Sequence, residues 1–346
     1  MEAAFSCLAR ARQHDLSVFL QRPTTWLSYR KGAFMLFERK IATVFGASGF
    51  LGRYVVQRLA ARGYIVRAAV RDTESAKILR PMGAVGQVVP LYAPVSAEAF
   101  AARAVEGAHI VINLAGILNE SRKNEFFATH ADGAGRVARL ARAAGAQLVH
   151  VSAIGADPAS QSAYAKSKGE GEQAVRSAHA DAVILRPSLI FGPEDRFFNR
   201  FAMLAAHSPV LPIIHGDTKL QPVYVVDVAD ACLAALEPRA AGKLYELGGP
   251  EQKTFKALMQ QMLDIIERKP CIWTIPTCLA QLAACVPYSG ITRDQIKLLA
   301  VDNVVAAGAL GLEQLGLTPS RLDLVLPGYL ARYRVSGRSR DDIFNE

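Results

Sequence analysis

The stretch Ile41–Gly52, IATVFGASGFLG, restricts the fold of this chain more than any other segment. Its short apolar run, Ile41–Phe45, predicts a buried strand, and apolar residues at helical spacing follow the glycines. Gly46 would permit a tight turn, Gly49 a close approach of the backbone to a pyrophosphate, and Gly52 close packing of the helix on the strand. Strand, glycine turn and helix in this order predict the first unit of a dinucleotide-binding βαβ fold. The alternative is a glycine-rich turn that binds nothing.

Composition narrows the class of protein. The chain has 346 residues, enough for one large or two modest domains, and a hydrophobic fraction of 51% excludes global disorder. Its formal charge of +9 is not gathered in one basic tract, so the sequence favours an acidic partner or an anionic membrane face over nucleic acid. The five cysteines form no CxxC pair, which fits a reducing compartment, and we expect Cys271, Cys278 and Cys285 to be small buried thiols. The histidines form no HxxxH or HExxH, and no metal site is predicted.

Short apolar runs alternate with helical patterns through the first half of the chain. This alternation predicts an α/β fold, a Rossmann-like doubly wound parallel sheet, followed by a smaller and mostly helical C-terminal region. After Ile41–Phe45, the predicted strands are Tyr64–Val70, Gln87–Leu91, His109–Asn113, Gln147–Val151 and Ala182–Leu185.

The chain divides by composition into three parts. Residues 1–40 are rich in arginine and aromatic residues and precede the fold, as a mitochondrial-type targeting segment, an arm on a partner subunit, or a loose tail. Residues 41–190 are the expected dinucleotide-binding domain. Residues 191–346 are the expected C-terminal lid or partner domain, with 221–236 returning to the Rossmann sheet.

Three segments of the C-terminal part carry more specific expectations. Pro222–Val228 is strand-like, and Thr254–Arg268 has apolar residues at the spacing of an amphipathic helix. Cys271–Pro287 is almost uncharged, which indicates a buried helix or a patch that faces a membrane.

Two strand ends indicate where a cofactor would bind. Arg71 and Asp72 follow the second predicted strand, where an acidic residue is typical of NAD and an arginine of NADP. Because Arg71 comes first, we favour NADP(H), and Asp72 keeps NAD(H) as the less favoured alternative. Ala115 and Gly116 follow the fourth predicted strand at the edge where open parallel sheets bind ligands.

Ser152, Tyr164 and Lys168 are the candidate catalytic residues. Tyr164 and Lys168 are four residues apart, so they share a helix face, and a nearby ammonium is expected to lower the pKa of the phenol. Ser152 follows the fifth predicted strand and could polarise a carbonyl. Such a set suits hydride transfer, with the redox chemistry supplied by a nicotinamide cofactor. The alternative is an exposed helix pair with no site.

Several strings together resemble the extended, atypical short-chain dehydrogenase/reductase superfamily over roughly residues 41–330: the glycine turn, NLAG, the Tyr/Lys pair, LRPSLIFGPEDRF and QPVYVVDVADA. A narrower resemblance, to the family of NADPH-binding accessory subunits of mitochondrial respiratory complex I (alpha-subcomplex subunit 9), is carried by LRPMGAVGQV, SAYAKSKGEGE, RPSLIFGPEDRFFNRF and QPVYVVDVADA. The resemblance implies a cofactor site made of Gly46, Ser48, Gly49, Phe50, Leu51, Gly52, Arg71, Ala115, Gly116, Ser152, Tyr164, Lys168 and Pro187.

That resemblance implies a non-catalytic subunit that holds NADP(H) tightly. Its implied partners are other complex I subunits of the peripheral arm and membrane interface, together with anionic lipid, on the matrix side of the mitochondrial inner membrane. One departure concerns the serine, because sugar-nucleotide epimerases place theirs about where Ile154 and Gly155 fall. A free-standing NADP-dependent reductase or epimerase-like enzyme and a cofactor-free scaffold remain as alternatives.

Overall fold

The computed structural model describes residues 40–120, 122, 124–283 and 292–334. The expectations for residues 1–39, for Cys285 and for the tail from Val335 lie outside these residues.

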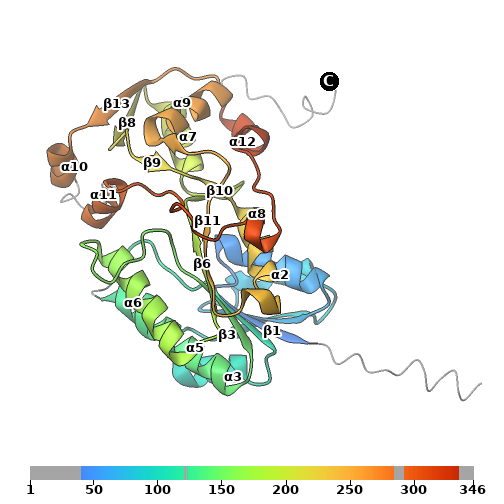
Figure 1. Cartoon of the computed structure of the whole chain (residues 1–346). Helices are drawn as coiled ribbons and strands as arrows, with labels where there is room; N and C mark the ends of the chain where they lie inside the picture. The colour runs from blue at the N-terminus through green and yellow to red at the C-terminus, as the bar shows by residue number, and fades with distance from the viewer. Residues whose placement is uncertain (1–39, 121, 123, 284–291, 335–346) are drawn as a thin grey trace, which may run out of the picture. The chain divides into compact units, whose positions relative to one another are not determined.

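A seven-stranded parallel sheet forms the centre of the described chain, in the order β11-β6-β5-β4-β1-β2-β3 (Figure 1). This arrangement confirms the predicted α/β class and doubly wound sheet, because the strand order reverses direction between β1 and β4. All six predicted strands are present, and the sequence analysis missed the seventh, β11. The strands are β1 (Ile41–Phe45), β2 (Ile65–Val70), β3 (Val88–Tyr92), β4 (Ile110–Asn113), β5 (Gln147–Val151), β6 (Val183–Pro187) and β11 (Leu244–Leu247).

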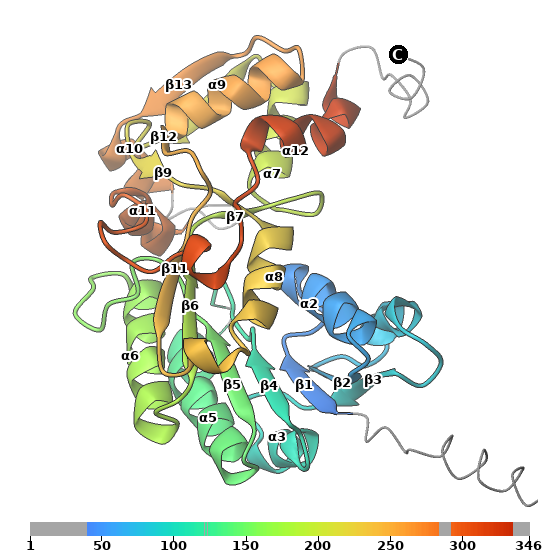
Figure 2. The ribbon, with the colours of Figure 1, turned by 45° about the vertical axis from the view of Figure 1, so that its right-hand side comes forward.

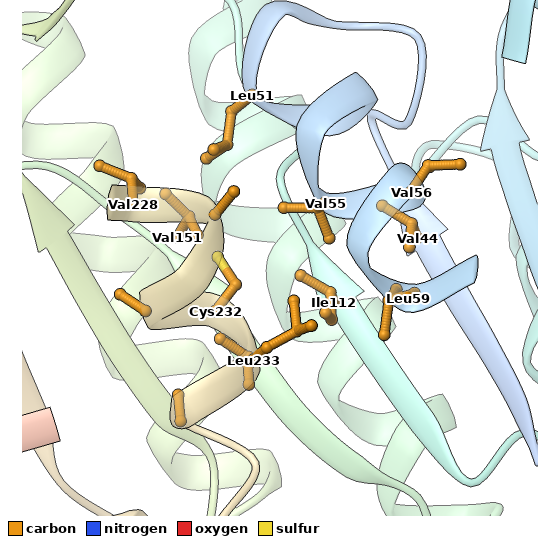
Figure 3. Packing of buried hydrophobic residues seen from close by; sticks show 14 of the residues in the cluster. Val44, Leu51, Val55, Val56, Leu59, Ile112, Val151, Val228, Cys232 and Leu233 are labelled. Carbon is orange, nitrogen blue, oxygen red and sulfur yellow. The ribbon is translucent and has the colours of Figure 1, made fainter. Parts of the chain in front are cut away.

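Helices cover both faces of the sheet (Figure 2). One face packs against α2 (Phe50–Ala61) and α8 (Val225–Ala234), and the other against α3 (Glu98–Val105), α5 (Gly133–Ala143) and α6 (Ala163–Ala178). On the first face, Val55 and Leu59 of α2 and Leu233 of α8 lie over Val44 and Ile112 (Figure 3). All five are almost fully buried, so this layer fixes α2 and the turn before it.

The prediction of a strand over Pro222–Val228 is wrong beyond Tyr224. Only β10 (Val223–Tyr224) is extended, and it pairs with β7 (Ile190–Phe191) outside the main sheet. The valines that follow begin α8, where Val225 and Val228 are buried at helical spacing against the sheet. Tertiary packing has here overridden the β preference of a valine-rich run.

A second core holds the C-terminal region together. It forms where α7 (Phe198–His207), α9 (Phe255–Ile265) and α12 (Leu322–Leu330) bring buried aromatic and aliphatic side chains into contact. Helix α9 confirms the amphipathic helix expected over Thr254–Arg268, with the Thr254 hydroxyl accepting from the Ala257 amide as its N-cap.

Cys271–Pro287 does not begin as a buried helix. Cys271–Ile275 is strand β13, which pairs with β8 (Val210–Ile214), and α10 (Thr277–Ala283) follows it. Cys271 and Cys278 are exposed, so the expectation of buried thiols is wrong for both. Among the described residues, no helix has the length and apolarity to cross a membrane. The remaining elements are η1 (Ser75–Met82), α4 (Glu125–Phe127), η2 (Ala128–Asp132), β9 (Lys219–Leu220), η3 (Pro238–Ala240), β12 (Lys253–Thr254), α11 (Arg293–Leu299), η4 (Glu313–Leu315) and η5 (Ala331–Tyr333).

Candidate functional site

The glycine turn lies at the point where the strand order reverses. Gly46 has φ of +75°, a left-handed conformation that glycine adopts without steric cost. A Cβ on Gly46 would lie 2.9 Å from the carbonyl oxygen of Leu114, at the end of β4. A Cβ on Gly52 would lie 2.3 Å from the carbonyl oxygen of Gly46. Both positions therefore require glycine, and the turns after β1 and β4 are in contact.

The amino end of α2 follows directly after the glycine turn. Gly49 is the N-cap, and among the described residues no side chain caps the helix and its first turn carries no acidic residue. Ser48 and Gly49 are exposed, whereas Leu51 is buried and Phe50 packs near Gly192. The first backbone N–H groups of the helix are thus available to an anion, supported by the helix dipole.

Arg71 and Asp72 lie beside the same turn, because the Gly46 amide donates to the carbonyl of Ala69 near the end of β2, at 3.2 Å. The Asp72 carboxylate accepts from the amide of Glu74 at 2.9 Å and from the amide of Ser75 at 3.3 Å. The hydrogen bonds from Ser75 and Glu74 lower the pKa of Asp72. Asp72 is therefore occupied in capping the turn that follows, while the Arg71 side chain is exposed.

Lys168 is buried beneath the ends of β4 and β5. Its side chain donates to the carbonyl of Val151 at 3.3 Å, and a Cβ on Gly116 would lie 3.4 Å from its Nζ. Burial lowers the pKa of Lys168 to about 8, opposed by the carboxylate of Glu172. The predicted lysine and the predicted strand-end turn are thus brought together.

Tyr164 lies one helical turn before Lys168, with its ring edge-on to Phe126 and to His130 at centroid distances of 5.8 and 5.4 Å. Burial raises the pKa of Tyr164 to about 12. The expectation that Lys168 would lower this pKa is wrong, because desolvation of the phenolate dominates. The raised pKa favours the neutral form of the Tyr164 phenol at physiological pH.

Ser152 is 4% exposed, directly after Val151 and so next to the carbonyl that Lys168 contacts. Among the described residues, nothing donates to or accepts from its hydroxyl. Its amide donates to Leu185 at 2.7 Å, and the Ile154 amide donates to Pro187 at 3.0 Å, which joins the ends of β5 and β6. Ser152 and Pro187 therefore lie at the same sheet edge as the other predicted site residues.

His130 is a site residue that the sequence analysis missed. Its Nε2 accepts from the Ile117 amide at 3.0 Å, so its Nδ1 carries the proton and donates to Ser167 Oγ at 2.9 Å. Ser167 in turn donates to the carbonyl of Tyr164 at 2.8 Å. Burial, with Lys168 and a second histidine nearby, lowers the pKa of His130 to about 2 and keeps it neutral. This chain of hydrogen bonds ties the turn after β4 to the helix of the Tyr/Lys pair.

A π-helical turn, η2, places His130 there. Such turns are frequent at functional sites but have no sequence signature of their own. Gly171 is the only local signal, since a Cβ on it would lie 2.0 Å from the His130 carbonyl oxygen, so α6 and η2 meet backbone to backbone. A second buried histidine, His150, contacts the Asn113 side chain through Nδ1 at 3.2 Å, while the side-chain oxygen of Asn113 accepts from the Ala115 amide. Within the described ranges, no cluster of His, Cys, Asp or Glu could hold a metal ion.

Comparison with known proteins agrees with this architecture. The model of a family described as "NAD dependent epimerase/dehydratase family" matches residues 42–248. Among solved structures, dTDP-glucose 4,6-dehydratase from Bacillus anthracis in complex with NAD is similar in fold. It has a TM-score of 0.67 and 16% sequence identity over 85% of this chain and 96% of that one.

Two curated relatives are more similar in sequence. "NADH dehydrogenase (ubiquinone) 1 alpha subcomplex subunit 9, mitochondrial" from Arabidopsis thaliana is 37% identical over 316 residues, which cover 86% of this chain and 79% of the relative. "Ceramide reductase" from Caulobacter vibrioides is 33% identical over 240 residues, which cover 69% of this chain and 74% of the relative. The chain therefore belongs to the NAD dependent epimerase/dehydratase family and to the family of the alpha subcomplex subunit 9 of NADH dehydrogenase (ubiquinone).

Proposed function

We propose that this chain is an accessory subunit of respiratory complex I that holds NADP(H) as a structural ligand and supports assembly near the quinone-site region. One observation carries the proposal: similarity to the plant subunit covers 86% of the chain, whereas the general family model stops at residue 248. The likeness therefore includes C-terminal residues beyond the dinucleotide-binding fold. A match confined to the Rossmann part would have supported only nucleotide binding.

The glycine turn fits the pyrophosphate of such a ligand. Gly46 and Gly52 leave no room for a side chain, and the uncapped amino end of α2 offers backbone N–H groups at Gly49, Phe50 and Leu51. The exposed Ser48 hydroxyl would lie beside the same phosphates. These residues would bind the cofactor through the backbone, as phosphate cradles at helix N-termini do.

NADP(H) suits the adenosine end better than NAD(H). An acidic residue selects NAD by accepting from the ribose 2′-hydroxyl, but Asp72 already accepts two backbone amides. Arg71 is exposed at that strand end and would pair with the 2′-phosphate. Both amides bind Oδ1, so the turn fixes the Asp72 side chain, and a ribose hydroxyl would have to reach Oδ2 in that fixed orientation.

At the other end, Tyr164 and Lys168 would hold the nicotinamide ribose, with Ala115, Gly116, Ser152 and Pro187 lining the nucleotide. A bound nicotinamide nucleotide would supply or accept a hydride there. Retention without turnover is supported by Tyr164, because a phenol with a pKa of about 12 is a poor general base at neutral pH. Ser152 lies tight against the end of β5, so it is poorly placed to polarise a substrate carbonyl.

The proposal also covers partners and location. Other complex I subunits of the peripheral arm and membrane interface would contact the C-terminal part, and residues 1–40 would serve as a targeting segment or a binding arm. The protein would bind peripherally at the matrix face of the mitochondrial inner membrane. A basic surface with net charge +9 suits contact with anionic lipid there.

Arg71→Glu tests the cofactor, with Arg62→Glu as a matched control. Both arginines are exposed, but Arg62 lies at the far end of α2. A ligand that binds only the folded state adds about 4 kcal/mol at a thousandfold excess over Kd. We expect NADPH to raise the melting temperature of the wild type and of Arg62→Glu, and to lose most of this effect in Arg71→Glu. Equal NADPH protection of all three proteins would refute the role of Arg71.

Native gels of membrane extracts from the source cells test the assembly. We expect the chain to migrate with a very large complex that contains NADH dehydrogenase activity. Migration only as a monomer or dimer would refute the subunit role. Analysis of the nucleotide that the denatured protein releases would show NADP(H), and release of NAD(H) or of no nucleotide would contradict the cofactor.

A free-standing NADP-dependent reductase is the second candidate, favoured by the 33% identity to the Caulobacter ceramide reductase and by the intact Tyr/Lys pair. Tyr164→Phe separates the two. In an accessory subunit, this variant should leave electron transfer of the assembled complex nearly unchanged. In a reductase, it should abolish NADPH-dependent carbonyl reduction while the bound nucleotide remains.

A further inference from the structure

Helix α11 (Arg293–Leu299) belongs to the C-terminal part of the chain, yet it reaches the amino end of α6 (Figure 1). The carboxylate of Asp294 accepts hydrogen bonds from the Ser162 hydroxyl at 2.9 Å and from the amides of Ala163 and Tyr164 at 2.8 and 3.1 Å. These groups form the first turn of the helix that carries the Tyr/Lys pair. The contact joins residues about 130 positions apart in sequence.

This carboxylate completes the cap of α6. The first N–H groups of a helix have no partner within the helix. The Ser162 hydroxyl accepts from the amide of Ala165 at 3.2 Å, which leaves the two preceding amides to Asp294. A negative charge there also complements the helix dipole. Without Asp294, the backbone amide of Tyr164 would lose its hydrogen-bond acceptor.

Two further contacts hold α11 in this place. Gln295 donates to the side-chain carbonyl of Asn119 at 3.0 Å, in the segment that follows the turn after β4. Lys297 donates to the carbonyl of Gln161 at 3.0 Å, just before α6. Helix α11 therefore contacts both segments that border the candidate nicotinamide end of the site.

We propose that Asp294 is a positioning residue that fixes the first turn of α6, and with it Tyr164 and Lys168, for the nicotinamide ribose. The inference rests on the proposed NADP(H) site. Asp294 acts through α6 and does not touch the ligand. It makes the nicotinamide half of the site depend on correct docking of the C-terminal part, while the glycine turn and Arg71 remain independent of it.

Two ligands test the two ends of the proposed site separately. NADPH would use the whole site, whereas adenosine 2′,5′-bisphosphate would use only the Arg71 and glycine-turn end. For Asp294→Ala we expect roughly tenfold weaker NADPH binding, the scale of a lost helix cap, and unchanged binding of the bisphosphate. Asp294→Asn keeps one acceptor oxygen, so its affinity for NADPH should fall between those of the wild type and Asp294→Ala. It also serves as a milder variant if Asp294→Ala folds poorly.

Asp302→Ala is the matched control. Asp302 also caps a backbone amide, that of Lys219 at 2.8 Å, but it does not contact α6. It should leave the binding of both ligands unchanged. Isothermal titration of each purified full-length protein measures the affinities.

Unchanged NADPH affinity in both Asp294 variants would overturn the proposal. So would an equal loss for NADPH and the bisphosphate, because general loosening weakens both halves of the site. A wild-type protein that binds neither ligand would instead refute the proposed NADP(H) site, and the inference with it. The wild-type titration separates this last outcome from the other two, which the titrations of the Asp294 variants distinguish from each other.

Discussion

Gly52→Ala is the sharpest test of how the turn and α2 fit together. The added Cβ would lie 2.3 Å from the carbonyl oxygen of Gly46 and 2.6 Å from that of Ala47. Both neighbours are backbone atoms, so no side-chain rotation can relieve the contact, and α2 must move outward by about 1 Å to restore normal separation. That movement would disturb the buried layer in which Val55 and Leu59 cover the sheet.

Overpacking of this kind costs about 1–3 kcal/mol, and the rigid backbone neighbours place Gly52→Ala at the upper end. At roughly 1.5 °C per kcal/mol for a chain of this length, we expect the melting temperature to fall by about 4–5 °C. The displaced α2 should also reduce the stabilisation that we expect NADPH to give to the wild type. Differential scanning calorimetry with and without NADPH measures both effects.

Gly328→Ala is the matched control. Gly328 lies in α12, where a Cβ would meet nothing within 4 Å. Alanine is the better helix former there by roughly 0.5–1 kcal/mol, so this variant should melt at or slightly above the wild-type temperature. If Gly52→Ala melted within about 1 °C of Gly328→Ala and kept NADPH, the close packing of turn and helix would be refuted.

Two further predictions concern buried charges. The pKa of Lys168 is about 8 in the folded chain, below its ordinary value, so the unfolded chain binds more protons between about pH 8 and 10.5 and stability should rise with pH over that range. Lys168→Met should increase the free energy of unfolding at pH 7 and remove its rise with pH. Thermal melts from pH 7 to 10 measure this. If the melting temperature of the variant depended on pH as that of the wild type does, the burial of Lys168 would be contradicted. Arg186 pairs with Glu172 at 2.7 Å and Glu246 at 3.4 Å, and both carboxylates are nearly buried. Arg186→Met should therefore cost about 3–5 kcal/mol in urea unfolding, and a loss under about 1 kcal/mol would show that the carboxylates are solvated.

Six of the seven strands of the main sheet could be predicted from sequence because each of them carries a local signal. The runs Ile41–Phe45 and Gln147–Val151 are apolar and lie between clear helical patterns, as parallel strands buried on both faces do. Strand β11 carries only four residues, Leu244–Leu247, and includes Glu246, whose carboxylate is satisfied by Arg186 of β6. It pairs in parallel with β6, and neither this pairing nor the ion pair that accompanies it is revealed by a local pattern.

Similar reasoning explains the errors in the C-terminal part. Val223–Tyr224 and Val225–Ala234 are both rich in β-branched or apolar residues, so periodicity alone does not mark where the strand ends and the helix begins. Cys271–Ile275 is apolar and uncharged, which suited a buried helix, but it pairs with β8 as a short strand with an exposed face. The deciding partner lies about 60 residues earlier in the chain.

The candidate site likewise has one part that depends on local sequence and one that depends on distant partners. The turn proposed for the pyrophosphate is local, because three glycines within seven residues permit its geometry, and the sequence therefore predicted the turn. The nicotinamide end of the proposed site is tertiary: the π turn supplies His130, and α11 supplies Asp294. The pKa of Tyr164 also follows from burial among these elements, which is why an argument from the Tyr/Lys spacing alone gave the wrong direction.

This division bears on how one fold can serve both a reductase and an accessory subunit. Substitutions at the glycine turn would end nucleotide binding altogether, so both roles share that constraint. Changes in η2 or α11 would alter the environment of Tyr164 and Lys168 while the nucleotide stayed bound. Turnover requires a phenol whose pKa is near the working pH, whereas retention requires only a hydrogen-bonding phenol. Tyr164, whose pKa is raised to about 12 by desolvation, fits the second requirement better than the first, which supports the proposal that this chain retains its nucleotide without turnover.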